Sequence, residues 1–212
     1  MRKREKEVQS PEAIALVLRE APWGALSLAT PGGKPFLVPL AFVYVQERLF
    51  FHSAPAGEKL TLIKTCPEAA FLVVDTFAKI PSYLFHPSDG GAGLTLFRSI
   101  ILHGRLSLVG DLELKAVVLQ AMLNKYQPEG SHEPVTATSP TYQAREKGLA
   151  IVEMTIEQKS GKFGLGQALN DDDMNLVTDF LAKRGTDNDQ HTLATLAFGM
   201  GPGNTPANLK LE

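Results

Sequence analysis

The chain has 212 residues, with 21 Lys and Arg against 23 Asp and Glu, so its formal charge at pH 7 is -2. A chain of this length holds one well-buried core with an appended segment and is short for two independent domains. The near-even charge provides no global attraction to nucleic acid or to an anionic membrane, so neither is an expected partner. Recognition of any partner has to come from a local site.

The cysteine and histidine content limits the redox compartment and the metal chemistry. Cys66 is the single cysteine, which excludes an intrachain disulfide and a cysteine-rich metal centre and fits a reducing compartment. The scattered histidines form no His-x-x-x-His pair, so we predict no metal site. The charged first ten residues precede no apolar signal core, and no stretch approaches the ~20 apolar residues of a membrane span. We therefore expect a cytoplasmic protein.

Hydrophobic periodicity predicts a helix followed by a run of strands. Ser10 as N-cap and Pro11 at the first helical position begin a helix that ends near Pro22. Alternating apolar and polar residues then predict strands over 23–30, 36–45 and 49–53. Their connections are short and turn-forming, so we expect the three strands to be antiparallel neighbours in a meander.

Mixed elements follow this meander. They are a short helix at 60–64, a strand at 69–78, a turn-rich loop at 80–93, a strand at 94–109, a helix at 112–126, a short helix at 139–147 and a strand at 149–157. Gly104 is a candidate bulge in the fifth strand, and an apolar stripe on the 112–126 helix comprises Leu112, Ala116, Leu119 and Leu123. Five or six strands with few helices favour a small barrel.

The composition changes to Gly, Asn and Asp beyond Lys159. A helix is predicted over 171–184, and the ending from Gly199 to Pro206 has the composition of a flexible tail. We therefore predict a domain over residues 1–160 and a C-terminal extension over 161–212 that is partly helical with a flexible tail.

The segment from Phe50 to Lys59 joins a strand end to a helix start through small residues. Such a junction exposes backbone N–H groups at the positive end of a helix dipole, which is a suitable anion site. Lys59, in the first helical turn, would add a full positive charge. The same pattern also fits a tight turn with a solvated lysine, so both interpretations stay open.

The same segment resembles a motif of nitroimidazole-resistance (Nim-type) flavoproteins. Phe51-His52-Ser53-Ala54, Gly57 and Lys59 match the family pattern aromatic-His-Ser-Ala-x-x-Gly-x-Lys. Further matches in the family order are the strand Gly24 to Leu28, Lys34-Pro35, Val38-Pro39-Leu40, Phe97-Arg98-Ser99-Ile100 and His103-Gly104-Arg105. Because this resemblance covers roughly residues 5–158, it is far more specific than one motif.

The resemblance implies a fold, a cofactor and an assembly. Nim-type proteins belong to the pyridoxamine 5′-phosphate-oxidase-like superfamily of FMN-binding split barrels. The implied fold is mainly β with α (α+β), a six-stranded antiparallel Greek-key split β-barrel flanked by helices, here over residues 1–160. The implied assembly is a homodimer with FMN at the subunit interface.

Nine positions are implied as FMN contacts. They are Val38, Pro39, Leu40, His52, Ser53, Ala54, Lys59, Arg98 and Ser99. Residues 38–40 correspond to the strand beside the isoalloxazine ring, although a core strand would look the same. Residues 52–54 correspond to the edge nearest the flavin, Lys59 to the phosphate ligand, and Ser99 to a second phosphate contact. Arg98 is either a bidentate phosphate ligand or a surface strand residue.

His52 is the candidate catalytic residue, because its motif position corresponds to the family histidine near the reactive face of the flavin. An imidazole donates or accepts a proton near neutral pH. The alternative is a strand-end histidine that only hydrogen-bonds to ligand or backbone.

The function implied is an FMN-dependent oxidoreductase that passes electrons to a small organic acceptor, such as a nitroaromatic. A second hypothesis is a non-catalytic flavin- or haem-binding protein, with a histidine as axial haem ligand. A third is a pyridoxamine-phosphate-oxidase-type enzyme. The chain departs from the Nim-type pattern at Gly91-Ala92-Gly93-Leu94, where the family often carries cysteine and tryptophan, and in its longer C-terminal region.

Overall fold

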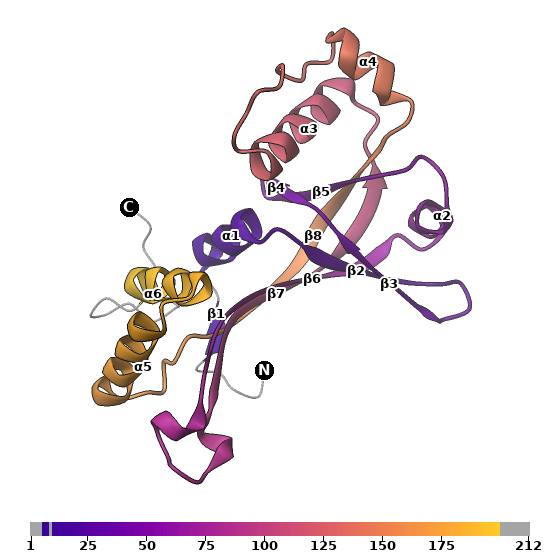
Figure 1. Ribbon diagram of the computed structural model, residues 1–212. Helices are drawn as coiled ribbons and strands as arrows, with labels where there is room; N and C mark the ends of the chain where they lie inside the picture. The colour runs from indigo at the N-terminus through magenta and orange to yellow at the C-terminus, as the bar shows by residue number, and fades with distance from the viewer. Residues whose placement is uncertain (1–5, 9, 200–212) are drawn as a thin grey trace. The chain divides into compact units, whose positions relative to one another are not determined.

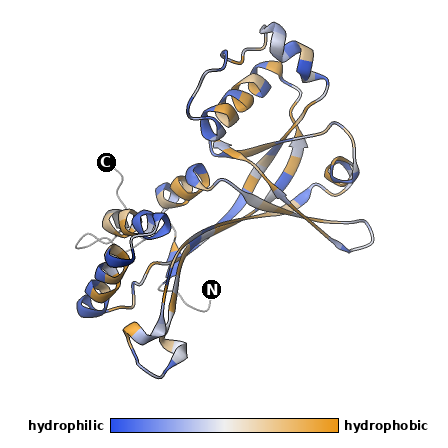
Figure 2. Ribbon diagram, in the orientation of Figure 1, coloured by the Kyte–Doolittle hydropathy of each residue, from blue (hydrophilic) through white to orange (hydrophobic). Residues whose placement is uncertain are grey.

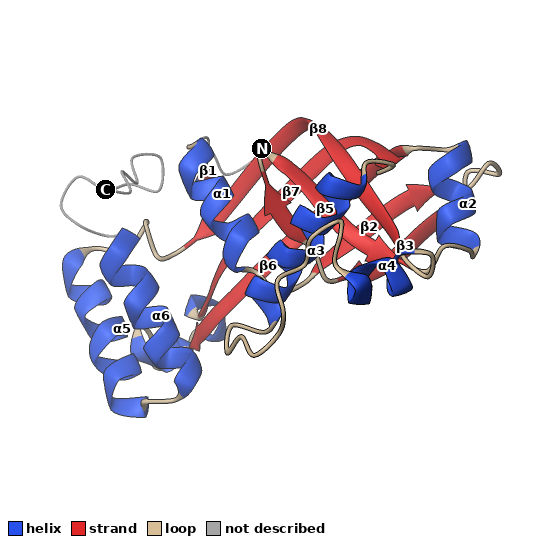
Figure 3. Ribbon diagram, turned by 90° about the horizontal axis from the view of Figure 1, so that it is seen from above, coloured by secondary structure: helices blue, strands red, loops and turns tan. Residues whose placement is uncertain are grey.

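The computed structural model describes residues 6–8 and 10–199, which form an antiparallel sheet with helices (Figures 1 and 3). The strands are β1 Glu7–Val8, β2 Gly24–Ala29, β3 Pro35–Leu40, β4 Val43–Val45, β5 Arg48–Ser53, β6 Glu68–Ile80, β7 Leu94–Leu108 and β8 Ala150–Gly164. The helices are α1 Pro11–Glu20, α2 Glu58–Thr65, α3 Leu112–Tyr126, α4 Pro140–Glu146, α5 Asp171–Arg184 and α6 Asp187–Gly199. The predicted α+β class is confirmed.

The chain divides into two compact units. The first unit comprises residues 1–17, 74–100 and 160–212, and the second comprises 18–73 and 101–159. The predicted separation of residues 1–160 from 161–212 stays a prediction. Within the C-terminal region, the sequence patterns missed α6, and β8 continues to Gly164 instead of ending at residue 157. The predicted flexible tail lies outside the described residues from residue 200 onward.

The sheet follows the order β3-β2-β6-β7-β8-β5-β4. β2 pairs with β3 in a hairpin, and β4 pairs with β5 through a turn in which Gln46 and Glu47 adopt φ values of 50° and 60°. β3 and β4 therefore lie at opposite ends of this order. Both predicted antiparallel pairings are present, as β2–β3 and β4–β5, but the predicted middle strand is divided, so the three strands form no continuous meander. The sheet has eight strands among the described residues instead of the predicted six.

The difference arises at Phe42, where the predicted single strand over 36–45 breaks into β3 and β4. The Phe42 side chain is fully buried, so its backbone groups need protein partners. They find them on α3: the Phe42 N–H donates to the Tyr126 hydroxyl at 2.9 Å, and Lys125 Nζ donates to the Phe42 carbonyl at 3.0 Å. These side-chain partners replace strand pairing at this residue.

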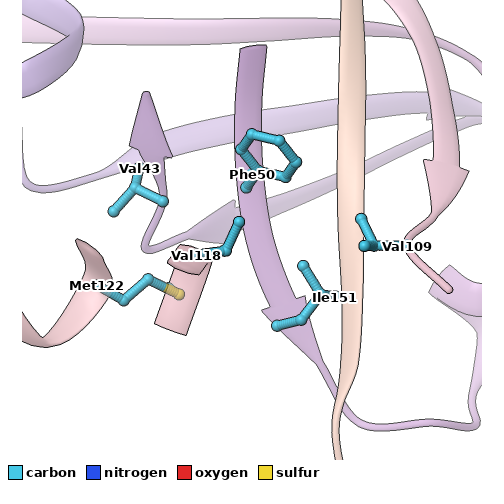
Figure 4. Close-up of a cluster of buried hydrophobic side chains, with 6 residues drawn as sticks. All are labelled: Val43, Phe50, Val109, Val118, Met122 and Ile151. Atoms are coloured by element: carbon cyan, nitrogen blue, oxygen red, sulfur yellow. The ribbon is translucent and has the colours of Figure 1, made fainter. Parts of the chain in front are cut away.

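The core of the second unit lies between α3 and the sheet (Figure 4). Its buried members are Val43, Phe50, Val109, Val118, Met122 and Ile151. Figure 2 shows most of α3 as hydrophobic, yet the apolar stripe predicted on it was partly wrong, because Leu112 is 49% exposed. Ala116 is buried as expected, and Val118 and Met122 supply the rest of the buried face. α2 lies beside β2 at the other side of this unit (Figure 3).

The first unit is organised by the α5–α6 hairpin, which Figure 1 shows as two adjacent helices. β2 pairs with β6 only as far as Val73. Beyond that residue α6 supplies the partners of β6, because Thr192 Oγ1 accepts from the Ala78 N–H at 2.9 Å. Arg184, at the end of α5, donates to the Lys79 carbonyl at 3.2 Å. The hairpin thus satisfies polar groups of a strand that would otherwise be exposed.

An ion pair fixes this hairpin internally. Arg184 donates two hydrogen bonds to the carboxylate of Asp189, whose side chain is completely buried. These bonds hold the pKa of Asp189 well below its ordinary value of 3.8. Because the folded pKa lies below the unfolded one, this stabilisation is present above pH ~4 and is lost as the pH falls further.

Two features are absent from the described residues. No helix there is long and apolar enough to cross a membrane. No group of three or more His, Cys, Asp or Glu side chains in the described part of the chain is arranged to hold a metal ion.

Gly104 is required for a close approach between β7 and β8. A Cβ atom at this position would overlap the Thr155 carbonyl oxygen, whereas a Cβ at Gly110 would meet nothing within 4 Å. We expect Gly104→Ala to lower the free energy of unfolding by about 1–3 kcal/mol, as overpacking does. Gly110→Ala should change it by less than about 1 kcal/mol. Urea denaturation followed by circular dichroism measures both, and equal effects would contradict the close approach.

The Arg184–Asp189 pair gives a second stability prediction. Arg184→Met leaves a buried carboxylate unpaired and should cost about 3 kcal/mol, the lower end for a buried ion pair because Arg184 is partly exposed. The control is Arg105→Met, since the Arg105–Glu68 pair is exposed on both sides, with side chains 55% and 68% accessible. Its loss should cost far less than the loss of Arg184, because solvent screens an exposed ion pair. If chemical denaturation shows that both variants lose a similar free energy of unfolding, the Arg184–Asp189 pair does not stabilise the fold more than an exposed pair does.

Candidate functional site

The second unit contains a cavity of about 850 Å³, within the range of ~300–1,000 Å³ typical of small-molecule sites. His52, the candidate catalytic residue, is part of its wall. The other lining residues are Trp23, Ala41, Leu119, Met122, Leu123, Tyr126, Gln127, His132, Glu133, Pro134, Val135, Ser139, Thr141, Tyr142, Arg145 and Leu149. The cavity therefore lies between α3, the segment through α4, and three connections of the sheet.

The alternation of β5 explains why His52 faces the cavity. Phe51 is fully buried and Ser53 is 6% exposed, while His52 between them points to the opposite side of the strand. Burial lowers the pKa of the His52 imidazole, and the positive charge of Lys59 lowers it further. The ring is therefore neutral at pH 7 and carries one N–H donor and one acceptor nitrogen.

The N-terminus of α2 has the geometry of an anion site. Gly57 is the N-cap, with a φ of 116° that favours glycine, and no side chain caps the helix. Lys59 lies in the first turn, half-buried, with Nζ 5.7 Å from the Phe51 ring centroid. Burial lowers the pKa of Lys59 from its ordinary value. Free N–H groups at a helix N-terminus together with a cation fit a phosphate or carboxylate.

The remaining predicted contacts of the second unit also fit a flavin. β3 lies at one end of the sheet, so its outer edge has no strand partner among the described residues. Val38 is half-buried, Pro39 is exposed and Leu40 is buried, and their free backbone edge offers hydrogen-bonding groups beside apolar side chains. Ala54 is exposed in the turn before α2. The edge of β3 by itself suits one face or edge of a flat ring.

Arg98 and Ser99 belong to the first unit. Arg98 is only 5% exposed, so its interpretation as a surface strand residue was wrong. Its guanidinium pairs with the Asp75 carboxylate and lies 5.0 Å from the Phe77 ring centroid. Ser99 Oγ donates to the Lys162 carbonyl at 3.3 Å. A phosphate contact of either residue stays a prediction.

The sequence patterns missed most of the cavity wall. Leu119 and Leu123 belong to the predicted stripe of α3 and line the cavity, while Val118 packs in the core and Met122 takes part in both. Residues 127–149 appeared in the sequence only as a Pro- and Gly-rich segment and a short helix. Within it, the Val135 N–H donates to Gln120 Oε1 at 2.8 Å, which attaches the segment to α3. The sequence signal that could have indicated this cavity was the presence of apolar residues on two faces of the 112–126 helix.

The last turn of α3 positions two further parts of the wall. The Tyr126 hydroxyl lies 2.8 Å from the Pro22 carbonyl oxygen, directly before Trp23, and bonds to Phe42, directly after Ala41. Lys125 Nζ lies 4.1 Å from the Phe42 ring centroid, and burial lowers the pKa of this lysine to about 8. These contacts hold both loops against α3.

A smaller hollow of about 420 Å³ also lies in the second unit, over β2, β6 and β7. His103, Gly104, Glu68 and Glu157 contribute to its lining, together with residues of the β2–β3 hairpin. None of the predicted site residues lines it.

Comparison with solved structures shows the fold. A provisionally assigned 5-nitroimidazole antibiotic resistance protein from Bacteroides thetaiotaomicron matches with a TM-score of 0.58 at 16% identity, over 74% of this chain and 85% of that one. The flavocytochrome Anf3 from Azotobacter vinelandii matches at 0.61 and 18% identity, over 80% and 75% of the two chains. An FAD and haem binding protein from Mycobacterium smegmatis matches at 0.60 and 18% identity, over 80% and 79%.

Comparison of the sequence assigns the family. No curated protein matches the chain. The family model described as pyridoxamine 5′-phosphate oxidase matches residues 10–163, which is well over half of the chain. This span covers the candidate site of the second unit together with both Arg98 and Ser99. The chain therefore belongs to the pyridoxamine 5′-phosphate oxidase family, within the superfamily of flavin-binding split-barrel proteins.

Proposed function

We propose that this protein is an FMN-dependent oxidoreductase that reduces a small organic acceptor, such as a nitroaromatic. The observation that carries the proposal is the β5–α2 junction, where His52 lines the large cavity and Gly57 to Lys59 form an anion site only five residues further on. One short segment thus joins a place for a phosphate to a place for an organic molecule. The family includes flavin-dependent oxidoreductases, which agrees with this assignment.

Each group of residues has a separate role in the proposed reaction. A bound flavin supplies the transfer of electrons. Lys59 and the N–H groups of α2 would hold its phosphate, and the outer edge of β3 would orient its ring. The neutral imidazole of His52 would donate an N–H hydrogen bond to an acceptor oxygen in the cavity and stabilise the negative charge that this oxygen gains with the electrons, and the product would take its proton from solvent. The apolar wall around it would exclude water.

A second candidate is a non-catalytic flavin- or haem-binding protein. Two histidines, His52 and His132, line the same cavity, and a neutral imidazole is an axial haem ligand in many proteins. The similar structures named as a flavocytochrome and as an FAD and haem binding protein favour keeping this candidate. Turnover of pyridoxamine phosphate would instead support the third function, that of a true pyridoxamine-phosphate oxidase.

The proposal includes a homodimer with FMN at the subunit interface and a sheet closed as a Greek-key split barrel. Its support is the apolar surface next to the edge strand β3. Leu37 is 69% exposed there, and Leu72 on β6 is 40% exposed. Exposed apolar side chains beside an unpaired strand edge are usually covered by a partner.

The cofactor proposal is tested by the absorbance spectrum after incubation with FMN and removal of unbound ligand. We expect flavin bands near stoichiometric occupancy, and Lys59→Met should weaken FMN binding by about 1–2 kcal/mol, the scale of a charge-assisted contact. Lys64→Met is the matched control, because Lys64 lies exposed in the last turn of the same helix. A Soret band on haem reconstitution without retained flavin would favour the second candidate.

The role of His52 is tested in a half-reaction that needs no physiological electron donor. Flavin bound to the protein is reduced with dithionite and mixed with a nitroaromatic, and its reoxidation is followed by stopped-flow absorbance. We expect His52→Ala to slow reoxidation about 10²-fold or more, the scale for loss of one hydrogen-bond donor to a developing oxyanion, with little change in FMN affinity. His132→Ala controls for a general change of the cavity. Equal losses of rate and FMN affinity would make His52 a binding contact only.

A further inference from the structure

We infer that the cavity beside α3 binds an uncharged, flat aromatic molecule, and that this site is distinct from the anion site at the N-terminus of α2. The inference deepens the proposed function, on which it rests for the identity of this molecule as the electron acceptor. Binding itself does not depend on a flavin, so it is measurable separately.

The wall of the cavity is mainly apolar. Leu119 and Leu123 come from one face of α3, Trp23 and Ala41 from two connections of the sheet, and Val135 from the segment before α4. Aromatic and aliphatic side chains of this kind bind flat apolar ligands through the area that they remove from water. The volume of about 850 Å³ leaves room for a ring system of two fused or linked rings.

The charges of the wall cancel. Glu133 and Arg145 are its formally charged side chains apart from the histidines, they have opposite signs, and both are exposed. A charged ligand entering the apolar part would lose its hydration without gaining a buried counterion, which is costly. The cation that lowers the pKa of His52 is Lys59, which belongs to the proposed anion site. The cavity therefore favours a neutral ligand over a phosphorylated or carboxylated one.

The imidazole of His52 in the wall can hydrogen-bond to a neutral ligand that carries an oxygen atom. Burial and Lys59 both lower the pKa of His52, so its ring is uncharged at pH 7 and presents a neutral hydrogen-bonding edge. A neutral donor pairs with a carbonyl or nitro oxygen without adding an unbalanced charge to the site. Uncharged quinones and nitroarenes share this chemistry.

The wall is largely fixed without ligand. Tyr126 holds the loops before Trp23 and after Ala41, and Gln120 holds Val135. Gln143 Nε2 of α4 donates to the Ala137 carbonyl at 3.1 Å, which joins α4 to the preceding segment. A preformed site loses less conformational entropy on binding than one that has to be ordered.

The test compares two probes with the same anilinonaphthalene skeleton in protein freed of flavin. N-phenyl-1-naphthylamine is neutral, and 8-anilino-1-naphthalenesulfonate carries a sulfonate. Trp23 is the single tryptophan of the chain and lines the cavity, so energy transfer from it to a probe reports binding to the protein, and the wall variants locate the probe. We expect the neutral probe to bind about tenfold tighter or better, since burying an unpaired charge is unfavourable. Equal affinities, or tighter binding of the sulfonate, would overturn the inference.

Two variants locate the probe. Leu123→Glu places a charge in the wall and should weaken binding of the neutral probe about tenfold or more, whereas Val117→Glu is the control, because Val117 is 48% exposed on the same helix and does not line the cavity. Val135→Asp repeats the test from the segment before α4 in case Leu123→Glu unfolds, which circular dichroism detects. Unchanged affinity in a folded wall variant contradicts the site.

The oxygen contact is tested by displacement of the neutral probe. 2-Methyl-1,4-naphthoquinone and 2-methylnaphthalene differ in the two carbonyl oxygens, and His52→Phe should weaken the quinone several-fold while leaving the hydrocarbon within about twofold. Equal changes for both ligands would remove His52 from the contact. If the protein binds these ligands but retains no flavin, the proposed function fails and the aromatic site stands. If it retains flavin but binds none of these ligands, the aromatic site fails and the flavin site stands.

Discussion

The hydrogen bonds between the last turn of α3 and the backbone of Phe42 are the constraint on which the second unit depends. A fully buried residue that leaves a strand must find partners for its N–H and C=O groups, since an unpaired buried polar group costs about 1–3 kcal/mol. Tyr126 and Lys125 supply these partners. The price of this arrangement is a half-buried lysine whose pKa falls to about 8. Its result is a helix held firmly over β4.

The apolar residues of α3 serve both the core and the cavity wall, and Met122 contributes to both. Val118 and Met122 complete the core against the sheet, as Figure 4 shows. Leu119 and Leu123 lie one position further round the helix and form part of a cavity wall. A helix that is hydrophobic on more than one face needs a second covering, and the segment from residue 127 through α4 provides it. The cavity is thus a consequence of how this helix is covered.

The charged groups of the second unit are separated according to the ligands proposed for it. The cation Lys59 and the uncapped N-terminus of α2 form the proposed anion site, while the cavity wall beyond His52 has no net formal charge. His52 lies where the two environments adjoin, and the lowered pKa of its imidazole reflects both burial and the nearby cation. An anionic cofactor and a neutral aromatic acceptor could therefore be held by one short stretch of chain without competing for the same groups.

The sequence by itself determined the local elements and the segment that carries the candidate chemistry. Periodicity located α1, β5 and α5 within a few residues, and the motif from Phe51 to Lys59 indicated the anion site, because helix starts and strand alternation depend on neighbouring residues. Only the tertiary structure decided the break at Phe42, the burial of Arg98 against Asp75, and the use of Leu119 and Leu123 in a cavity. The physical reason is distance along the chain. Phe42 and Tyr126 are 84 residues apart, so no local pattern records their contact.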